Sequence, residues 1–95
     1  GSIDREYAIG SGRLDLFVRY RDAKLPIELK VWRPGQRDPL KEGLEQLDRY
    51  LEALSLSRGW LVIFDRRKDD ASHVRRARAK EMKTPGQREA VVIRA

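Results

Sequence analysis

Apolar and polar residues alternate along the first third of the chain, which is typical of β-strands with two different faces. The alternation predicts strands over residues 13–20 ("RLDLFVRY") and 25–32 ("LPIELKVW"), joined by a short turn, and a shorter strand over residues 5–9. In the strand at 25–32, Glu28 and Lys30 lie on one face. The opposite face, which we expect to be buried, is formed by Leu25, Ile27, Leu29 and Val31.

Leucines at steps of four and three follow, which is the period of an amphipathic helix. They predict a helix over residues 40–57, with Asp38 as its N-terminal cap and Pro39 at its first position. Gly59 is suited to end this helix. The leucines expected on its buried side are Leu40, Leu44, Leu47, Leu51 and Leu54.

The second half of the chain contains a continuous apolar run over residues 60–65, typical of a strand that is covered on both faces. A weaker helical pattern over residues 69–83 predicts a second helix, and a turn at 84–87 precedes a last strand at 90–95. The expected order is therefore β-β-β-α-β-α-β. This order predicts one α/β domain over residues 3–95, with a mixed sheet flanked by helices.

Length and composition narrow the class of protein. The 95 residues suffice for one compact domain. No apolar run approaches the roughly 20 residues that cross a bilayer, and the lack of cysteine fits a reducing cytoplasm, so we expect a cytoplasmic domain with no membrane contact. The opening Gly1 and Ser2 look like the remnant of a cleaved tag, which suggests a piece cut from a longer protein.

Positive charge is concentrated in the second half of the chain. Residues 1–57 hold 10 basic and 10 acidic residues, whereas residues 58–95 hold 11 basic and 5 acidic, which accounts for the net charge of +6. Such an excess suits a polyanion such as nucleic acid, although an arginine-rich solvated surface would have the same composition. The candidates for phosphate contacts are Arg66, Arg67, Lys68, Arg75, Arg76, Arg78 and Lys80.

Three charged residues in the predicted strands form a candidate catalytic group. Glu28 and Lys30 project from the same face because they are two residues apart, and a hairpin would bring Asp15 beside Glu28. Two neighbouring carboxylates repel unless a cation lies between them, and Mg²⁺ prefers oxygen ligands. Taken alone, Glu28 and Lys30 favour an ordinary ion pair on a half-exposed sheet.

The segments "GRLDLFV" and "LPIELKV", followed by Gln46 and Tyr50 in the predicted helix, resemble the PD-(D/E)XK nuclease superfamily. The resemblance covers residues 5–65 and implies a restriction-endonuclease-like fold. It is greatest to the branch found at the C-terminus of AAA-ATPase-like proteins, which implies an ATPase domain in the same parent chain. The activity implied is hydrolysis of phosphodiester bonds in DNA with Mg²⁺ or Mn²⁺.

The resemblance also implies roles for individual residues. The implied metal ligands are Asp15, Glu28 and the backbone carbonyl of Leu29. Lys30 would orient or help deprotonate the attacking water and offset charge on the phosphate. The side chains that would position the substrate or the active-site groups are Gln46 and Tyr50.

The sequence departs from the family pattern at its start. The usual core opens with a helix, and only a few residues precede the strand at 5–9. Without that helix one face of the sheet would be partly uncovered, which favours a homodimer. Two alternatives to a nuclease stay open: an inactive nuclease-fold domain that binds nucleic acid or docks to a partner ATPase, and an unrelated basic interaction module.

Overall fold

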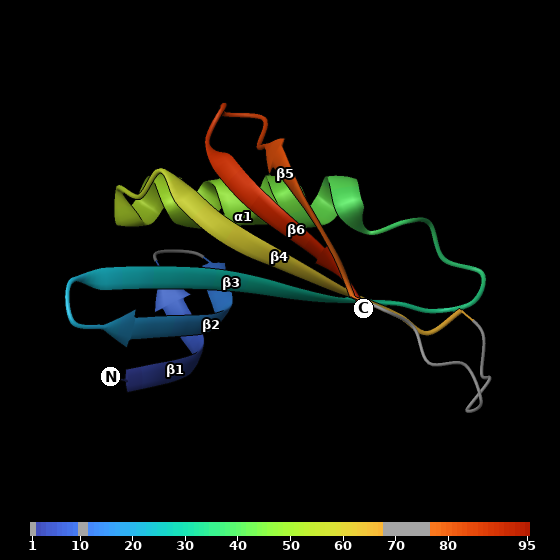
Figure 1. Cartoon of the computed structure of the whole chain (residues 1–95), viewed down its shortest axis with the longest axis horizontal. Coiled ribbons are helices and arrows are strands. Elements are labelled where there is room, and N and C mark those ends of the chain that lie inside the picture. Colours follow the sequence, from blue (N-terminus) through green and yellow to red (C-terminus); the bar gives the residue numbers. More distant parts are fainter. Residues whose placement is uncertain (1, 10–11, 68–76) are drawn as a thin grey trace.

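Within the residues that the structure describes, the fold contains one helix and six strands (Figure 1). The computed structural model describes residues 2–9, 12–67 and 77–95, with the backbone alone for residues 2–9, 12–16 and 20. In chain order the elements are β1 (Ser2–Ile9), β2 (Gly12–Tyr20), β3 (Ala23–Trp32), α1 (Leu40–Leu54), β4 (Arg58–Asp65), β5 (Arg78–Lys83) and β6 (Glu89–Arg94).

The strands form a single mixed sheet in the order β1-β2-β3-β4-β6-β5. Strands β1, β2 and β3 are antiparallel neighbours, and β3, β4 and β6 run parallel. Strand β5 pairs antiparallel with β6. The long connection that contains α1 allows β4 to return parallel to β3. The expected α/β class with a mixed sheet is therefore confirmed. Within the described residues, no helix has the length and apolar character needed to span a membrane.

Helix α1 covers one face of the sheet because its leucine stripe is buried there. Leu47 and Leu51 are fully buried and Leu44 nearly so. The N-cap is Pro39 and has no side-chain capping hydrogen bond, so the predicted cap at Asp38 and first helical position at Pro39 were wrong. Asp38 precedes the cap, and its Oδ1 accepts from the N–H of Leu40 at 3.0 Å. The helix ends at Leu54, earlier than predicted, and is followed by Ser55, whose φ of 56° is left-handed. The core around this stripe consists of Leu44, Leu47, Leu51, Leu61, Ile63, Ala90 and Val92.

Gly59 does not end the helix, so that prediction was wrong. It lies inside β4 and is buried. A Cβ at this position would lie 2.8 Å from Cδ1 of Leu47 and 3.2 Å from the carbonyl oxygen of Pro26. The residue is therefore glycine because α1 and β3 approach the backbone of β4 closely there.

The prediction of a second helix over residues 69–83 is also wrong for those of its residues that the structure describes. Its last residues form β5, so the described order is β-β-β-α-β-β-β, while residues 69–76 lie outside the described part. A tight turn after β5, closed by a 2.8 Å bond from the N–H of Thr84 to the carbonyl of Arg88, folds this segment back beside β6. Pairing from Arg78 with Arg94 through Lys83 with Glu89 then overrides the helix propensity of the sequence.

The buried face of β3 is opposite to the one predicted. Leu29 and Val31 are 37% and 40% exposed, whereas Pro26 and Glu28 are buried. Helix α1 packs on the face that bears Glu28, so the more apolar face of β3 is less covered than the polar one. The homodimer expected from an uncovered face stays a prediction.

Candidate active site

Glu28 is a buried acid within an apolar row of the sheet. It pairs with Leu61 of β4, which pairs in turn with Val92 of β6. Their exposed fractions are 2%, 0% and 3%. Removing a carboxylate from water is costly unless a cation or hydrogen bonds compensate it, so such a position is rarely filled by an acid for packing alone.

The ladder between β2 and β3 ends one residue short of Asp15 and Glu28. It runs from Tyr20 opposite Ala23 to Leu16 opposite Ile27. Asp15 and Glu28 are the next residues of the two strands. Their expected neighbourhood stays a prediction, because the carboxyl group of Asp15 lies outside the described side chains.

Lys30 lies on the same face as Glu28, one step further along β3, and reaches toward α1. Its Nζ is 3.3 Å from Oε1 of Glu42, and the Lys30 side chain is only 20% exposed. Gln46 Nε2 donates to the same Oε1 at 3.4 Å. A single carboxylate oxygen thus connects the predicted lysine to the predicted glutamine.

Glu42, an exposed acid of α1, therefore joins the residues of the candidate site. Glu42 and Gln46 are four residues apart on α1, which puts them on one side of the helix. That spacing could have identified Glu42 as a member of the site. Gln46 and Tyr50 are both half-buried on the flank of the leucine stripe, as expected for residues that border the sheet.

Four of the predicted phosphate-binding residues can be located. Arg66 and Arg67 follow the end of β4, and Arg78 and Lys80 belong to β5, and all four are exposed. The remaining candidates lie outside the described residues; they are Lys68, Arg75 and Arg76. Arg78 of β5 pairs with Arg94 of β6, and Arg94 pairs in turn with Ile63 of β4. Positive charge therefore accumulates at the end of the sheet where β4 and β6 end.

An aromatic side chain joins this basic region. The guanidinium carbon of Arg67 lies 3.6 Å from the ring centroid of Trp32, and that of Arg94 lies 5.8 Å from it. Arg67 is held by Asp65 at 2.8 Å, and Arg94 by Asp38 at 2.9 Å. We call these residues the Trp32 cluster: Trp32, Asp38, Asp65, Arg67 and Arg94. Neither the stacking nor the ion pairs could be foreseen from the sequence.

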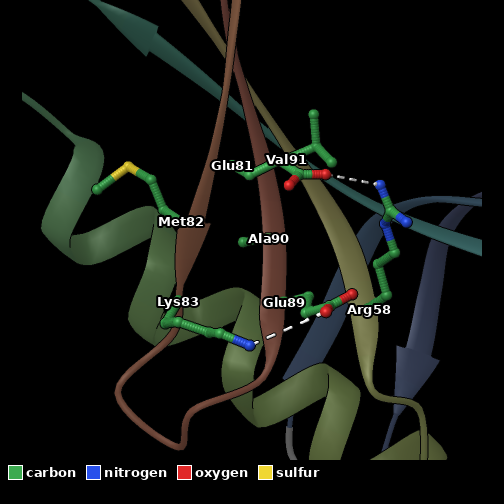
Figure 2. A pocket seen from close by; sticks show the side chains of 7 residues that line it. All are labelled: Arg58, Glu81, Met82, Lys83, Glu89, Ala90 and Val91. Carbon is green, nitrogen blue, oxygen red and sulfur yellow. Dashed lines mark hydrogen bonds and ion pairs between the residues drawn. The ribbon is translucent and has the colours of Figure 1, made fainter.

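A small pocket lies beside the start of β4, away from the Trp32 cluster, and contains none of the predicted catalytic residues (Figure 2). Its charged groups are already paired, since Arg58 lies 3.3 Å from Glu81 and Lys83 lies 3.9 Å from Glu89. It opens beside the first residues of β4, whereas the predicted residues lie further along β3. We therefore locate the candidate site at Glu28 and Lys30.

The residues around Glu28 fit a hard divalent cation by the chemistry of their donors. Mg²⁺ prefers oxygen ligands. Oxygen is the donor atom of the Glu28 carboxylate and the Leu29 carbonyl, and also of Asp15, the expected third ligand. Among the side chains that the structure describes, no three acidic or histidine residues gather into a metal site, and the side chain of Asp15 is not one of those described.

Comparisons with models of protein families, with curated proteins and with solved structures found no match to this chain.

Proposed function

We propose that this domain is a divalent-metal-dependent nuclease with a restriction-endonuclease-like fold, which hydrolyses phosphodiester bonds of DNA. The observation that carries the proposal is the burial of Glu28, 2% exposed, in a row with Leu61 and one residue beyond the pair of Leu16 and Ile27. A second acid beside a buried one raises the cost of burial. A bound cation would remove that cost, and the lysine two residues on is suited to phosphate chemistry.

In this proposal Mg²⁺ or Mn²⁺ is held by Asp15, Glu28 and the carbonyl of Leu29. When bound, such an ion lowers the pKa of water and offsets negative charge on a phosphate. Lys30 contributes a fixed positive charge beside the same phosphate and orients the water that attacks it. Its side chain is only 20% exposed, so the charge acts where solvent screens it weakly.

Helix α1 contributes the groups that hold this lysine in position. Glu42 accepts from both Lys30 and Gln46, which fixes the two side chains relative to each other. Tyr50, one turn further along α1, is suited to position the substrate. The proposal thus divides the site between ligands on β2 and β3 and positioning groups on α1.

The test is cleavage of supercoiled, linear and single-stranded DNA with Mg²⁺ or Mn²⁺. We expect Glu28→Gln and Asp15→Asn to abolish cleavage and to weaken Mn²⁺ binding measured by calorimetry. Glu45→Gln is the matched control, because Glu45 is an exposed acid of α1 on the side away from the sheet. Full cleavage by Glu28→Gln, or loss of cleavage by the control to the same degree, would refute the proposal.

A second candidate is a nuclease-fold domain that binds nucleic acid without cutting it and serves an ATPase in the same parent chain. The exposed arginines around the ends of β3, β4 and β6 favour it, since they need no metal to bind phosphate. Calorimetry separates the two candidates. A domain that only binds should take up DNA with no saturable Mn²⁺ site that depends on Glu28.

A further inference from the structure

The parallel strands end side by side at the surface that bears the Trp32 cluster (Figure 1). Trp32 pairs with Asp65 at the last position of the β3–β4 ladder, and the N–H of Arg66 donates to the carbonyl of Trp32 at 2.7 Å. The N–H of Asp65 bonds the carbonyl of Ala95, which brings the end of β6 to the same place. In open α/β sheets, ligands bind beyond these carboxyl ends of parallel strands.

Arg67 is fixed before any ligand arrives. Its Nε and NH2 donate to Oδ1 and Oδ2 of Asp65 at 3.0 and 2.8 Å, and the guanidinium lies over the ring of Trp32. The hydrogen bond to Asp65 raises the pKa of Arg67, so the group stays charged. Because Asp65 binds the Nε and NH2 groups of Arg67, the NH1 group points away from Asp65. The Arg67 side chain is 47% exposed.

This arrangement suits a phosphate group. A planar guanidinium binds phosphate through two parallel N–H donors, and a side chain already held in place loses little freedom on binding. Arg33, Arg37 and Arg66 are exposed around the cluster and add positive charge. The nearby Asp38 and Asp65 already bond Arg94 and Arg67, so the surface as a whole favours a polyanion.

The surface also leads to the candidate active site. Trp32 and Lys30 are two residues apart on the same face of β3, which corresponds to about 7 Å. That separation is comparable to the distance between neighbouring phosphates along one strand, which is about twice the axial rise of about 3.4 Å per nucleotide. A backbone held by Arg67 can therefore continue to Lys30 without leaving the surface.

We propose that the Trp32 cluster binds the phosphate backbone of nucleic acid, with Arg67 as its fixed phosphate contact. Binding at this site needs no metal and no cleavage. Only its role in delivering a phosphate to Lys30 rests on the proposed nuclease function.

The test measures binding of fluorescently labelled oligonucleotides by anisotropy in EDTA, where metal-dependent cleavage cannot occur. Single-stranded DNA, duplex DNA and RNA are compared, because all three carry the same backbone chemistry. We expect Arg67→Ala to weaken binding roughly tenfold, as the loss of one charge-assisted contact predicts. For duplex DNA, the slope of log affinity against log salt concentration should fall by about 0.9.

Two further variants locate the effect. Arg67→Lys keeps the charge but cannot bind Asp65 side-on while stacking on Trp32, so we expect it to lose most of the affinity. Arg49→Ala removes the same charge from the exposed outer side of α1 and should change affinity less than about twofold. Urea unfolding of each variant checks that the fold is kept.

The outcomes separate this inference from the proposed function. If Glu28→Gln stops cleavage but binds as wild type, while Arg67→Ala binds weakly, both proposals stand. If no DNA is ever cut but Arg67→Ala alone weakens binding, the binding site stands and the nuclease does not. Equal losses in the Arg67 and Arg49 variants, or no binding by wild type at low salt, would overturn the inference.

Discussion

The ammonium of Lys30 and the carboxylate of Glu42 meet where β3 and α1 pack together, with Nζ 3.3 Å from Oε1. Gln46 donates to that same oxygen, so one acid connects strand and helix. The Glu42 side chain is 66% exposed, and such pairs contribute little to stability. Any consequence of the contact should therefore appear in activity and not in folding.

Removing the Glu42 carboxylate should release Lys30 and Gln46 together. For Glu42→Ala we expect kcat of DNA cleavage to fall about tenfold, because a misplaced charge costs roughly 1.4 kcal/mol of transition-state stabilisation. KM should stay within about twofold, and the free energy of unfolding should change by about 0.5 kcal/mol or less. Steady-state kinetics and urea unfolding measure these quantities.

The conservative variant Glu42→Gln tests whether Glu42 acts by positioning Lys30 and Gln46 or through its negative charge. Its side-chain oxygen can still accept from both partners, so a positioning role predicts near-normal kcat. If Gln and Ala at this position reduce kcat equally, the negative charge matters and the positioning role is wrong. Glu52→Ala, an exposed acid near the other end of α1, serves as the control.

The two faces of the sheet should differ in their tolerance of a hydroxyl. Val92 is 3% exposed and lies under α1, whereas Val31 is 40% exposed. For Val92→Thr we expect a loss of about 1–3 kcal/mol in the free energy of unfolding, because its hydroxyl would be buried. Val31→Thr should change this free energy by less than about 0.5 kcal/mol. Equal effects in urea unfolding would contradict the assignment of faces.

Asp48 should make the fold sensitive to acid. Its Oδ1 accepts from Thr84 Oγ1 at 2.6 Å and from Arg88 NH1 at 2.9 Å, which ties α1 to the hairpin of β5 and β6. Burial raises the pKa of Asp48, but these hydrogen bonds outweigh it and leave the pKa below its ordinary value of 3.8. The folded state thus favours the ionised form.

A group with a depressed folded-state pKa contributes stability that is fully present above its ordinary pKa. That stability is lost as pH falls through the folded-state pKa. We expect Asp48→Asn to be less stable than wild type by about 1–2 kcal/mol near pH 7, with a difference that shrinks below about pH 4. Urea unfolding over this range measures it. A difference that stays constant down to about pH 2.5, or one shared by the exposed control Asp22→Asn, would contradict the prediction.

Gly43 should be required by packing, although it lies inside a helix. A Cβ there would lie 2.7 and 2.9 Å from the two methyl carbons of Leu61, which is fully buried. Alanine gains up to about 1 kcal/mol in helix propensity, but overpacking costs about 1–3 kcal/mol. We expect Gly43→Ala to lower the free energy of unfolding by about 1 kcal/mol.

A double-mutant cycle tests the cause of this loss. In a Leu61→Ala background the crowding atoms are gone, so Gly43→Ala should become neutral or stabilising. Circular dichroism during urea unfolding gives each free energy. The same penalty in both backgrounds would show that Leu61 is not responsible.

Much of the candidate site follows from local spacing. The short turn between β2 and β3 sets the register, and the alternation of side chains then puts Glu28 and Lys30 on one face. Spacing could not supply the position of Glu42, because that depends on how α1 lies across β3. The Trp32 cluster could not be foreseen either, since it joins residues from β3, from the connection before α1 and from the ends of β4 and β6.

The errors in the predicted fold have related causes. The alternation in β3 is real, but periodicity alone does not say which face a helix will cover, and α1 covers the face with Glu28. The segment Arg78–Lys83 has good helix formers, yet the tight turn at Thr84 folds it onto β6. Gly59 looked like a helix terminator, although close contact with Leu47 explains it better.

The sequence by itself determined the strands of the first hairpin, the leucine side of α1 and the common face of Glu28 and Lys30. Each depends on residues close together in the chain, where periodicity and turn length fix the geometry. Only the tertiary structure decided which face of the sheet is buried, the strand state of β5 and the meeting of Glu42 with Lys30. These features depend on contacts between segments that are distant in the chain. A local sequence pattern does not determine the relative energies of such contacts.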